Sequence, residues 1–303
     1  MTMPKVLITG GTGSIGTYLS NFLAEKGYDV AILSRGRNTG SKLKTYLWNY
    51  KEDFIEPEAL ETADYIIHMA GAGIADKRWT NKRKKEIIES RVATSELLYR
   101  ALAKCKNKPK VFISASGIGY YGQQTTDKIF KETDPAGNDF VGETCRLWEA
   151  SVNKINGLGI KTINLRIGVV MMKNGGALEK MAQPIRMGVG APLGSGKQMV
   201  PWIHIADLNR IILHAINITS MEGAYNTCVP ESVTNIDLTK TLAKVLHKKL
   251  LLPNTPAWVL KMILGERSVL LTEGSRVSSD KILSTGFQFK FTDLENALQD
   301  ILG

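Results

Sequence analysis

The stretch Lys5-Val-Leu-Ile-Thr-Gly-Gly-Thr-Gly-Ser-Ile-Gly16 decides the fold of this chain. A short apolar run that ends in a glycine cluster is typical of a buried parallel strand. Apolar residues then recur at helical spacing as far as Leu23, and Gly27 ends the predicted helix. A second apolar run over residues 28–33 completes a strand–helix–strand unit. Glycines at this spacing, in this context, predict a dinucleotide-binding loop.

Each glycine of the loop has a physical task. Gly11 permits the tight turn, Gly13 lets the backbone approach a pyrophosphate, and Gly16 lets helix and strand pack closely. The unpaired N–H groups and the positive dipole end of the helix would hold the phosphates. We therefore expect the cofactor to contact Gly10, Gly11, Thr12, Gly13, Ser14, Ile15 and Gly16.

The end of the second strand indicates which dinucleotide binds. An NAD-preferring fold places Asp or Glu there to hold the ribose 2′-hydroxyl. This chain has Ser34-Arg35 instead. A carboxylate would repel a 2′-phosphate, whereas an arginine binds it with charge-assisted bonds. The sequence thus favours NADP(H), held in part by Ser34 and Arg35; the alternative is that Arg35 is only a solvated surface residue.

The alternation of strands and helices continues along the chain. Further strands are expected at residues 43–48, 65–70, 111–114 and 161–167, with long helices at 81–103 and 139–156. This order predicts an α/β fold with a doubly wound, parallel, Rossmann-type sheet.

The composition of the sequence changes after Val170. A Gly- and Pro-rich stretch predicts loops up to about residue 200, followed by a strand at 202–205 and a helix at 207–217. We expect residues 1–170, with 201–223 returning to them, to form the NADP(H)-binding domain. Residues 171–200 and 224–303 would form a smaller, discontinuous substrate lobe at the C-terminal end.

Composition narrows the class of protein. Cys105, Cys145 and Cys228 are scattered and predict neither a disulfide framework nor a metal site. No stretch approaches the ~20 apolar residues of a membrane span, and the start of the sequence leaves no room for a signal peptide. We expect a cytoplasmic protein with no membrane partner.

The net charge of +10 raises the question of an anionic partner. The densest basic run comprises Lys77, Arg78, Lys82, Arg83, Lys84, Lys85 and Arg91. Such a run is usually a solvated helix face. No aromatic series interleaves it and no zinc-finger or RNA-binding signature accompanies it, so nucleic acid is not favoured as a partner.

Short motifs from end to end of the chain indicate a family. They are Gly10-Gly-Thr-Gly-Ser-Ile-Gly16, His68-Met-Ala-Gly-Ala72, Arg78-Trp79, Ser90-Arg91, Ser114-Ala-Ser116, Gly119-Tyr-Tyr-Gly122, Trp148-Glu149, Leu165-Arg-Ile-Gly168, Gly194-Ser-Gly-Lys-Gln198, Trp202-Ile-His204 with Asp207, Leu264-Gly-Glu266 and Gly286-Phe287. With these motifs the chain resembles the extended short-chain dehydrogenase/reductase superfamily, of the sugar-nucleotide epimerase type. Within it, the chain is most similar to atypical epimerase family proteins that carry an additional C-terminal domain.

The resemblance implies roles for particular residues. Ser116 matches the active-site serine that hydrogen-bonds the reacting oxygen, and His204 with Asp207 matches a segment near the substrate cleft. The C-terminal lobe would hold a small polar, nucleotide-linked substrate; a homodimer is left open. Further contacts to the cofactor are implied for Ala70, Gly71, Ala72, Arg91 and Ser114.

The chain departs from the superfamily at one decisive place. Those enzymes use a Tyr followed four residues later by Lys, on the helix after the serine strand, to move a proton. The corresponding helix here has Val141 and Cys145 at these positions, or Phe140 and Thr144 if the alignment shifts by one residue. The substitutes we consider for the acid–base group are Tyr120, Tyr121, Cys145 and His204.

Two functions stay open at this point. The first is an NADP(H)-dependent oxidoreductase or epimerase, for which Ser116 and a retained substrate lobe argue. The second is a non-catalytic NADP(H)-binding or sensing protein, for which the missing Tyr/Lys pair argues. A nucleic-acid binder is a weaker third hypothesis. Fold alone does not decide among the three functions.

Overall fold

A computed structural model describes residues 3–37, 40 and 42–303 and confirms the Rossmann-type fold. The central sheet has eight strands in the order β12-β8-β6-β5-β1-β2-β3-β4. All neighbouring strands are parallel except β3 and β4, which pair antiparallel at one edge. The strands are β1 (Lys5–Thr9), β2 (Asp29–Ser34), β3 (Lys44–Asn49), β4 (Phe54–Ile55), β5 (Tyr65–His68), β6 (Val111–Gly117), β8 (Lys161–Ile167) and β12 (Gly223–Thr227).

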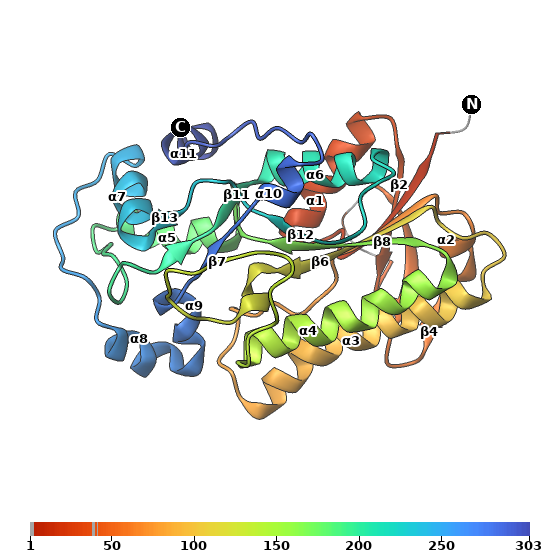
Figure 1. Ribbon diagram of the computed structural model, residues 1–303, viewed down its shortest axis with the longest axis horizontal. Coiled ribbons are helices and arrows are strands. Elements are labelled where there is room, and N and C mark those ends of the chain that lie inside the picture. Colours follow the sequence, from red (N-terminus) through yellow and green to blue (C-terminus); the bar gives the residue numbers. More distant parts are fainter. Residues whose placement is uncertain (1–2, 38–39, 41) are drawn as a thin grey trace.

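Helices cover both faces of this sheet (Figure 1). One face packs against α1 (Ser14–Glu25) and α6 (Ile205–Asn217), and the other against α2 (Pro57–Glu61), α3 (Asn81–Lys104) and α4 (Phe140–Asn153). Successive side chains of a strand point to opposite faces. The apolar run in β1 is therefore continuous because both of its faces are buried.

A second unit lies beyond the sheet at the left of Figure 1. Its core includes the fully buried Trp202 and side chains of α5 (Gly176–Arg186), α7 (Asn235–Val245) and α11 (Leu294–Leu302). Two small sheets belong to it: β9 (Val169–Met171) with β11 (Trp202–His204), and β10 (Met199–Val200) with β13 (Val233–Thr234).

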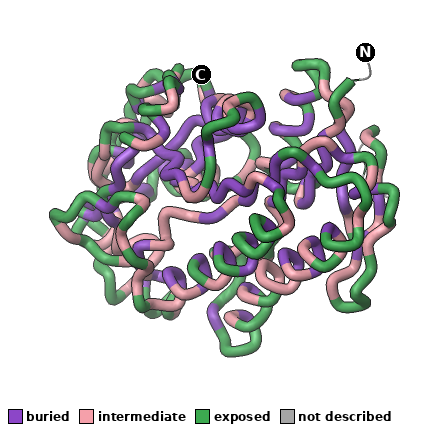
Figure 2. The backbone as a smooth tube through the Cα atoms, turned by 45° about the vertical axis from the view of Figure 1, so that its right-hand side comes forward, coloured by how far each residue is buried: buried purple, intermediate pink, exposed green. Residues whose placement is uncertain are grey.

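The remaining elements are short. A further small sheet pairs β7 (Ile129–Phe130) with β14 (Arg276–Val277). The other helices are α8 (Ala257–Leu264), α9 (Val269–Thr272), α10 (Asp280–Leu283) and the 3-10 turns η1 (Ile118–Tyr121), η2 (Lys154–Leu158) and η3 (Gly265–Ser268). Buried residues gather in the interior of the molecule, and exposed residues on its outer turns (Figure 2).

Two segments differ from the sequence-based expectation. The stretch expected to be loops contains α5, whose buried Leu178, Ala182 and Ile185 recur at helical spacing. Its Pro184 lies in the last turn, so the missing N–H removes one helical hydrogen bond just before the helix ends at Arg186. Residues 224–227, expected in the lobe, instead form most of β12 and pair with β8 at the edge of the central sheet.

Candidate cofactor and active site

The glycine loop forms an open cradle at the carboxyl end of β1. Gly10 has a φ of +72°, and a Cβ there would lie 2.9 Å from the Met69 carbonyl oxygen. A Cβ on Gly16 would collide with the Gly10 backbone. These two glycines are thus required by the close approach of the helix, β1 and the neighbouring loop.

The same loop fits a phosphate group. Gly13, the N-cap of α1, places no side chain over the helix end, and the first turn contains no acidic residue. A Cβ on Gly13 would meet only the Gly10 carbonyl oxygen, at 3.2 Å, and Thr12, Gly13 and Ser14 are exposed. The first N–H groups of α1 therefore have no side-chain cap, as an anion site requires.

The end of β2 presents positive charge. Arg35 is exposed, and no carboxylate among the described residues forms an ion pair with it. Arg37 differs, because its guanidinium is paired with Glu56. Ser34 lies at the last position of β2, and its hydroxyl accepts a 3.4 Å hydrogen bond from Gly36 N–H.

A buried histidine supports the second cofactor loop. Thr9 Oγ1 accepts hydrogen bonds from the backbone N–H groups of Met69 and Ala70, both at 3.1 Å, and lies 2.7 Å from His68 Nδ1. The Thr9 hydroxyl must then donate to Nδ1, which leaves the proton of the neutral ring on Nε2, beside Ser95 Oγ at 3.2 Å. Burial lowers the pKa of His68 to about 3, so the ring stays neutral.

Arg91 holds the following residues of this loop. Its guanidinium donates to the Ala72 carbonyl at 3.0 Å and lies over the Trp148 ring. A Cβ on Gly71 would come within 3.1 Å of the Arg91 guanidinium carbon, so the loop lies directly on that side chain. Ser114, in contrast, is fully buried and donates to the Ala115 carbonyl.

Ser116 belongs to a buried polar network. Its hydroxyl donates to Glu149 Oε1 at 2.7 Å, and Arg166 binds both oxygens of the same carboxylate at 2.9 and 2.8 Å. Burial opposes the charge on Arg166, but hydrogen bonding and attraction to Glu149 raise its pKa overall. The single Ser116 proton is therefore directed at Glu149.

The two tyrosines of η1 have different environments. Tyr121 is fully buried; its hydroxyl donates to Asn226 Oδ1 at 2.7 Å and accepts from Arg166 at 2.9 Å. Burial raises the pKa of Tyr121 to about 12. Tyr120 is half-buried, and the Arg166 guanidinium lies 3.4 Å from the centre of its ring. Among the described residues, none forms a hydrogen bond with the Tyr120 hydroxyl.

Helix α4 carries no Tyr and no Lys at the positions considered. Val141 and Cys145 are buried, and burial raises the pKa of the Cys145 thiol to about 11. Thr144 donates its hydroxyl to the Phe140 carbonyl at 2.6 Å. Phe140 packs edge-on against Trp79.

His204 and Asp207 join the C-terminal segment to α6. His204 caps α6 by accepting a hydrogen bond from Ala206 N–H at 3.1 Å, and its ring stacks on Phe291. Burial lowers the pKa of His204. The buried Asp207 carboxylate accepts from the N–H groups of Lys290 and Phe291.

The basic run is not one solvated face. Arg83 is buried and donates to the Gly73 carbonyl, and Lys84 pairs with Glu266 of the C-terminal lobe. Arg91 supports the cofactor loop, as described above. These three side chains are engaged within the fold, whereas Lys77, Arg78, Lys82 and Lys85 are exposed.

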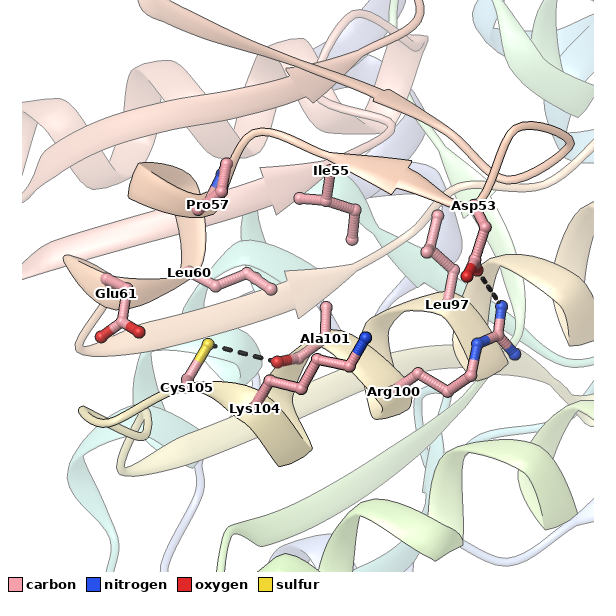
Figure 3. A pocket seen from close by; sticks show the side chains of 10 residues that line it. All are labelled: Asp53, Ile55, Pro57, Leu60, Glu61, Leu97, Arg100, Ala101, Lys104 and Cys105. Carbon is pink, nitrogen blue, oxygen red and sulfur yellow. Dashed lines mark hydrogen bonds and ion pairs between the residues drawn. The ribbon is translucent and has the colours of Figure 1, made fainter.

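Two cavities stand out among the described residues. One, of about 370 Å³, lies beside η1 and is lined by Tyr121, Phe130 and the loop at 135–139. The other, of about 300 Å³, lies between α2 and the end of α3, where Lys104 and Cys105 line it (Figure 3). Only the first adjoins the candidate active-site residues. No cluster of three or more metal-binding side chains is found in the described part of the chain.

Glu149 and Arg166 belong to motifs of the sequence, but the sequence alone predicts no role for either residue. The signal was available: Arg166 is a charged residue inside the apolar strand Lys161–Ile167. A buried charge needs a partner. That partner, Glu149, comes from α4 and could be identified only once the helix was placed against β8.

The comparisons with known proteins agree with this geometry. Residues 6–228 match the NAD dependent epimerase/dehydratase family, and residues 255–301 match a domain of unknown function, DUF1731. The chain belongs to the NAD dependent epimerase/dehydratase family.

Particular relatives narrow the placement. The chain is 34% identical to the epimerase family protein SDR39U1 of Homo sapiens, over 98% of this chain and 99% of the relative. It is 35% identical to the epimerase family protein YfhF of Bacillus subtilis, over 98% of each. These relatives confirm the predicted resemblance to epimerase family proteins.

Solved structures extend the comparison. A crystal structure of human SDR39U1 with NADPH superposes with a TM-score of 0.87 at 32% identity, covering 98% of both chains. This finding agrees with the predicted cofactor. A nucleoside-diphosphate sugar epimerase from Corynebacterium glutamicum superposes with a TM-score of 0.81 at 27% identity, over all of this chain and 59% of the other. Within the described residues, no helix combines the length and apolar content needed to cross a membrane.

Proposed function

We propose that this protein binds NADP(H) at the β1–α1 loop, the end of β2 and residues 69–72. The observation that carries the proposal is the exposed, uncapped N-terminus of α1 beside an unpaired Arg35. The human relative crystallised with NADPH supports it. When bound, NADP(H) supplies hydride chemistry; the residues of this chain bind the cofactor, orient it and manage protons.

We further propose a slow oxidoreductase or epimerase activity with Tyr120 as the proton-carrying group. Of the three hydroxyls considered, those of Ser116 and Tyr121 are already hydrogen-bonded within the buried network. The Tyr120 hydroxyl is without such a partner in the described structure, and the Arg166 cation holds its ring in place. Tyr120 would hold or release a proton at Oη, while Glu149 and Arg166 position the strand end.

The alternative is a non-catalytic NADP(H)-binding or sensing protein. Its support is that α4 contains neither Tyr nor Lys, so the superfamily's proton-moving pair is missing whether it aligns with Val141 and Cys145 or with Phe140 and Thr144. General acid–base help is typically worth ~10²–10⁴-fold in rate. A protein without that help can retain the cofactor site for binding alone.

The proposed substrate is small, polar and nucleotide-linked. The support is the likeness to a nucleoside-diphosphate sugar epimerase and the cavity beside η1. We propose that the C-terminal lobe, residues 171–200 and about 228–303, holds this substrate. A homodimer and a cytoplasmic location stay predictions.

The experiment that separates the two functions is an NADPH-oxidation screen with carbonyl compounds and nucleotide sugars. Any turnover should be lost in Tyr120→Phe, with NADPH affinity unchanged. Ser116→Ala and Tyr121→Phe should instead lower the thermal unfolding midpoint, because they break a buried network. Turnover indifferent to Tyr120→Phe would exclude its proposed role. Tight NADPH binding with no turnover across the screen would favour the binding function.

A further inference from the structure

The outer edge of the C-terminal lobe exposes a group of large apolar side chains. Leu251 and Leu252 lie in the segment before α8, and Trp258, Met262 and Ile263 lie on α8 itself. We name these five residues the α8 patch. The three helical side chains are 65–67% exposed. Figure 1 shows α8 and the segment leading to it from α7 at the end of the lobe farthest from β4.

The patch follows from helical geometry. Trp258 and Met262 are four residues apart, as are Val259 and Ile263, so they form one stripe on the helix surface. Leu260 faces inward and is buried. Helix α8 is therefore apolar on its inner face, where it packs, and also on its outer face, where nothing in the described chain covers it.

Lysines dominate the segment that carries the patch, between Asp237 before it and Glu266, which pairs with Lys84, after it. Residues 238–265 contain five lysines and no Asp or Glu. Lys244 is paired with Glu295. Lys248, Lys249 and Lys261 are exposed, and no ion pair to them is formed within the described residues. Lys261 thus lies on α8 together with Trp258 and Met262, and Lys248 and Lys249 directly precede Leu250, Leu251 and Leu252 in the segment that leads to α8.

We propose that the α8 patch binds the surface of an anionic lipid bilayer. Tryptophan favours the membrane–water interface, and an apolar helix face flanked by lysines lies in that interface plane. Each lysine near an anionic leaflet adds attraction. The sequence-based expectation of no membrane partner rested on the lack of a spanning segment, which such peripheral binding does not need.

A second copy of the chain is a poorer occupant for this surface. In a two-fold symmetric contact the same patch meets itself. Lys248, Lys249 and Lys261 of one copy would then face the same lysines of the other without any carboxylate of this segment between them. Like charges placed together disfavour that contact. An anionic bilayer has the complementary charge.

Tryptophan fluorescence provides a specific test on the full-length protein. Trp48, Trp79, Trp148 and Trp202 are at most 8% exposed, whereas Trp258 is 67% exposed. Acrylamide should therefore quench mainly Trp258. Vesicles of phosphatidylcholine with phosphatidylglycerol should protect it and shift its emission to the blue, whereas pure phosphatidylcholine vesicles should do neither. Trp258→Phe should remove the quenchable signal.

Co-sedimentation with the same vesicles measures binding independently. Lys248→Ala with Lys249→Ala should weaken binding about thirtyfold, from the usual contribution of a lysine near an anionic surface. The matched control is Lys82→Ala with Lys85→Ala on α3, which removes the same charge elsewhere and should leave binding unchanged. NADPH affinity and the unfolding midpoint should be unaltered in both, because all four side chains are exposed.

Three results would overturn the proposal. The first is no sedimentation with anionic vesicles. The second is an equal loss of binding in the α3 control, which would indicate attraction by net charge alone. The third is patch-dependent self-association in sedimentation equilibrium without vesicle binding, which would identify a second copy as the occupant. None of these outcomes bears on the cofactor site.

Discussion

Replacing Arg35 by alanine should convert an NADP(H)-preferring site into one that barely distinguishes the two cofactors. Arg35 follows β2 directly, is exposed, and has no carboxylate partner among the described residues, so its charge is free to meet a 2′-phosphate. NADH lacks that phosphate. The substitution should therefore weaken NADPH binding and leave NADH binding unchanged.

The magnitude follows from the exposure of the side chain. Hydrogen bonds to charged groups contribute about 1.5–3 kcal/mol, and an exposed position lies at the lower end because water screens the charge. About 1.5 kcal/mol corresponds to roughly a tenfold loss in NADPH affinity. The loss should shrink as salt concentration rises.

Arg37 offers a matched control two residues away. Its guanidinium is already paired with Glu56, so Arg37→Ala should change the NADPH affinity far less. Isothermal titration of wild type and both variants with NADPH and NADH measures all the required affinities. Equal wild-type affinities for the two cofactors, or an unchanged preference in Arg35→Ala, would refute the reasoning.

Three further predictions concern the loop, the network and pH. Gly13→Val should keep the fold but lose the thermal stabilisation by NADPH, whereas Gly16→Val should destabilise the protein itself, because a Cβ there collides with backbone; similar melting curves for both would contradict this. Arg166→Met should cost about 3–5 kcal/mol in urea unfolding, since it strands the buried Glu149 carboxylate, and a cost below about 1 kcal/mol would show that the pair is dispensable. The pKa of His68 falls from 6.5 when unfolded to about 3 when folded. The stability that the neutral ring contributes to the folded state is therefore complete above pH 6.5 and is lost as pH falls toward 3. From pH 7 to 5 this loss is about 2 kcal/mol, and His68→Asn should show a correspondingly flatter pH dependence of unfolding.

The nucleotide-binding half of the molecule could be predicted from the sequence because its determinants are local. A glycine loop, the strand before it and the helix after it are contiguous in residues 5–25, and their geometry follows from sterics and the helix dipole. The charge at the end of β2 is equally local. Helix α5 was not predicted, because its glycines and its proline favour loops. Leu178, Ala182 and Ile185 nevertheless recur at helical spacing.

Tertiary structure alone decided which candidate hydroxyls have partners. Ser116 on β6 meets Glu149 from α4, and Tyr121 of η1 meets Asn226 from β12. Arg166 on β8 joins both pairs. These residues are 17 to 105 positions apart in the chain. No short-range pattern encodes such pairings, since they exist only where the packed sheet brings the elements together and burial obliges each polar group to find a partner.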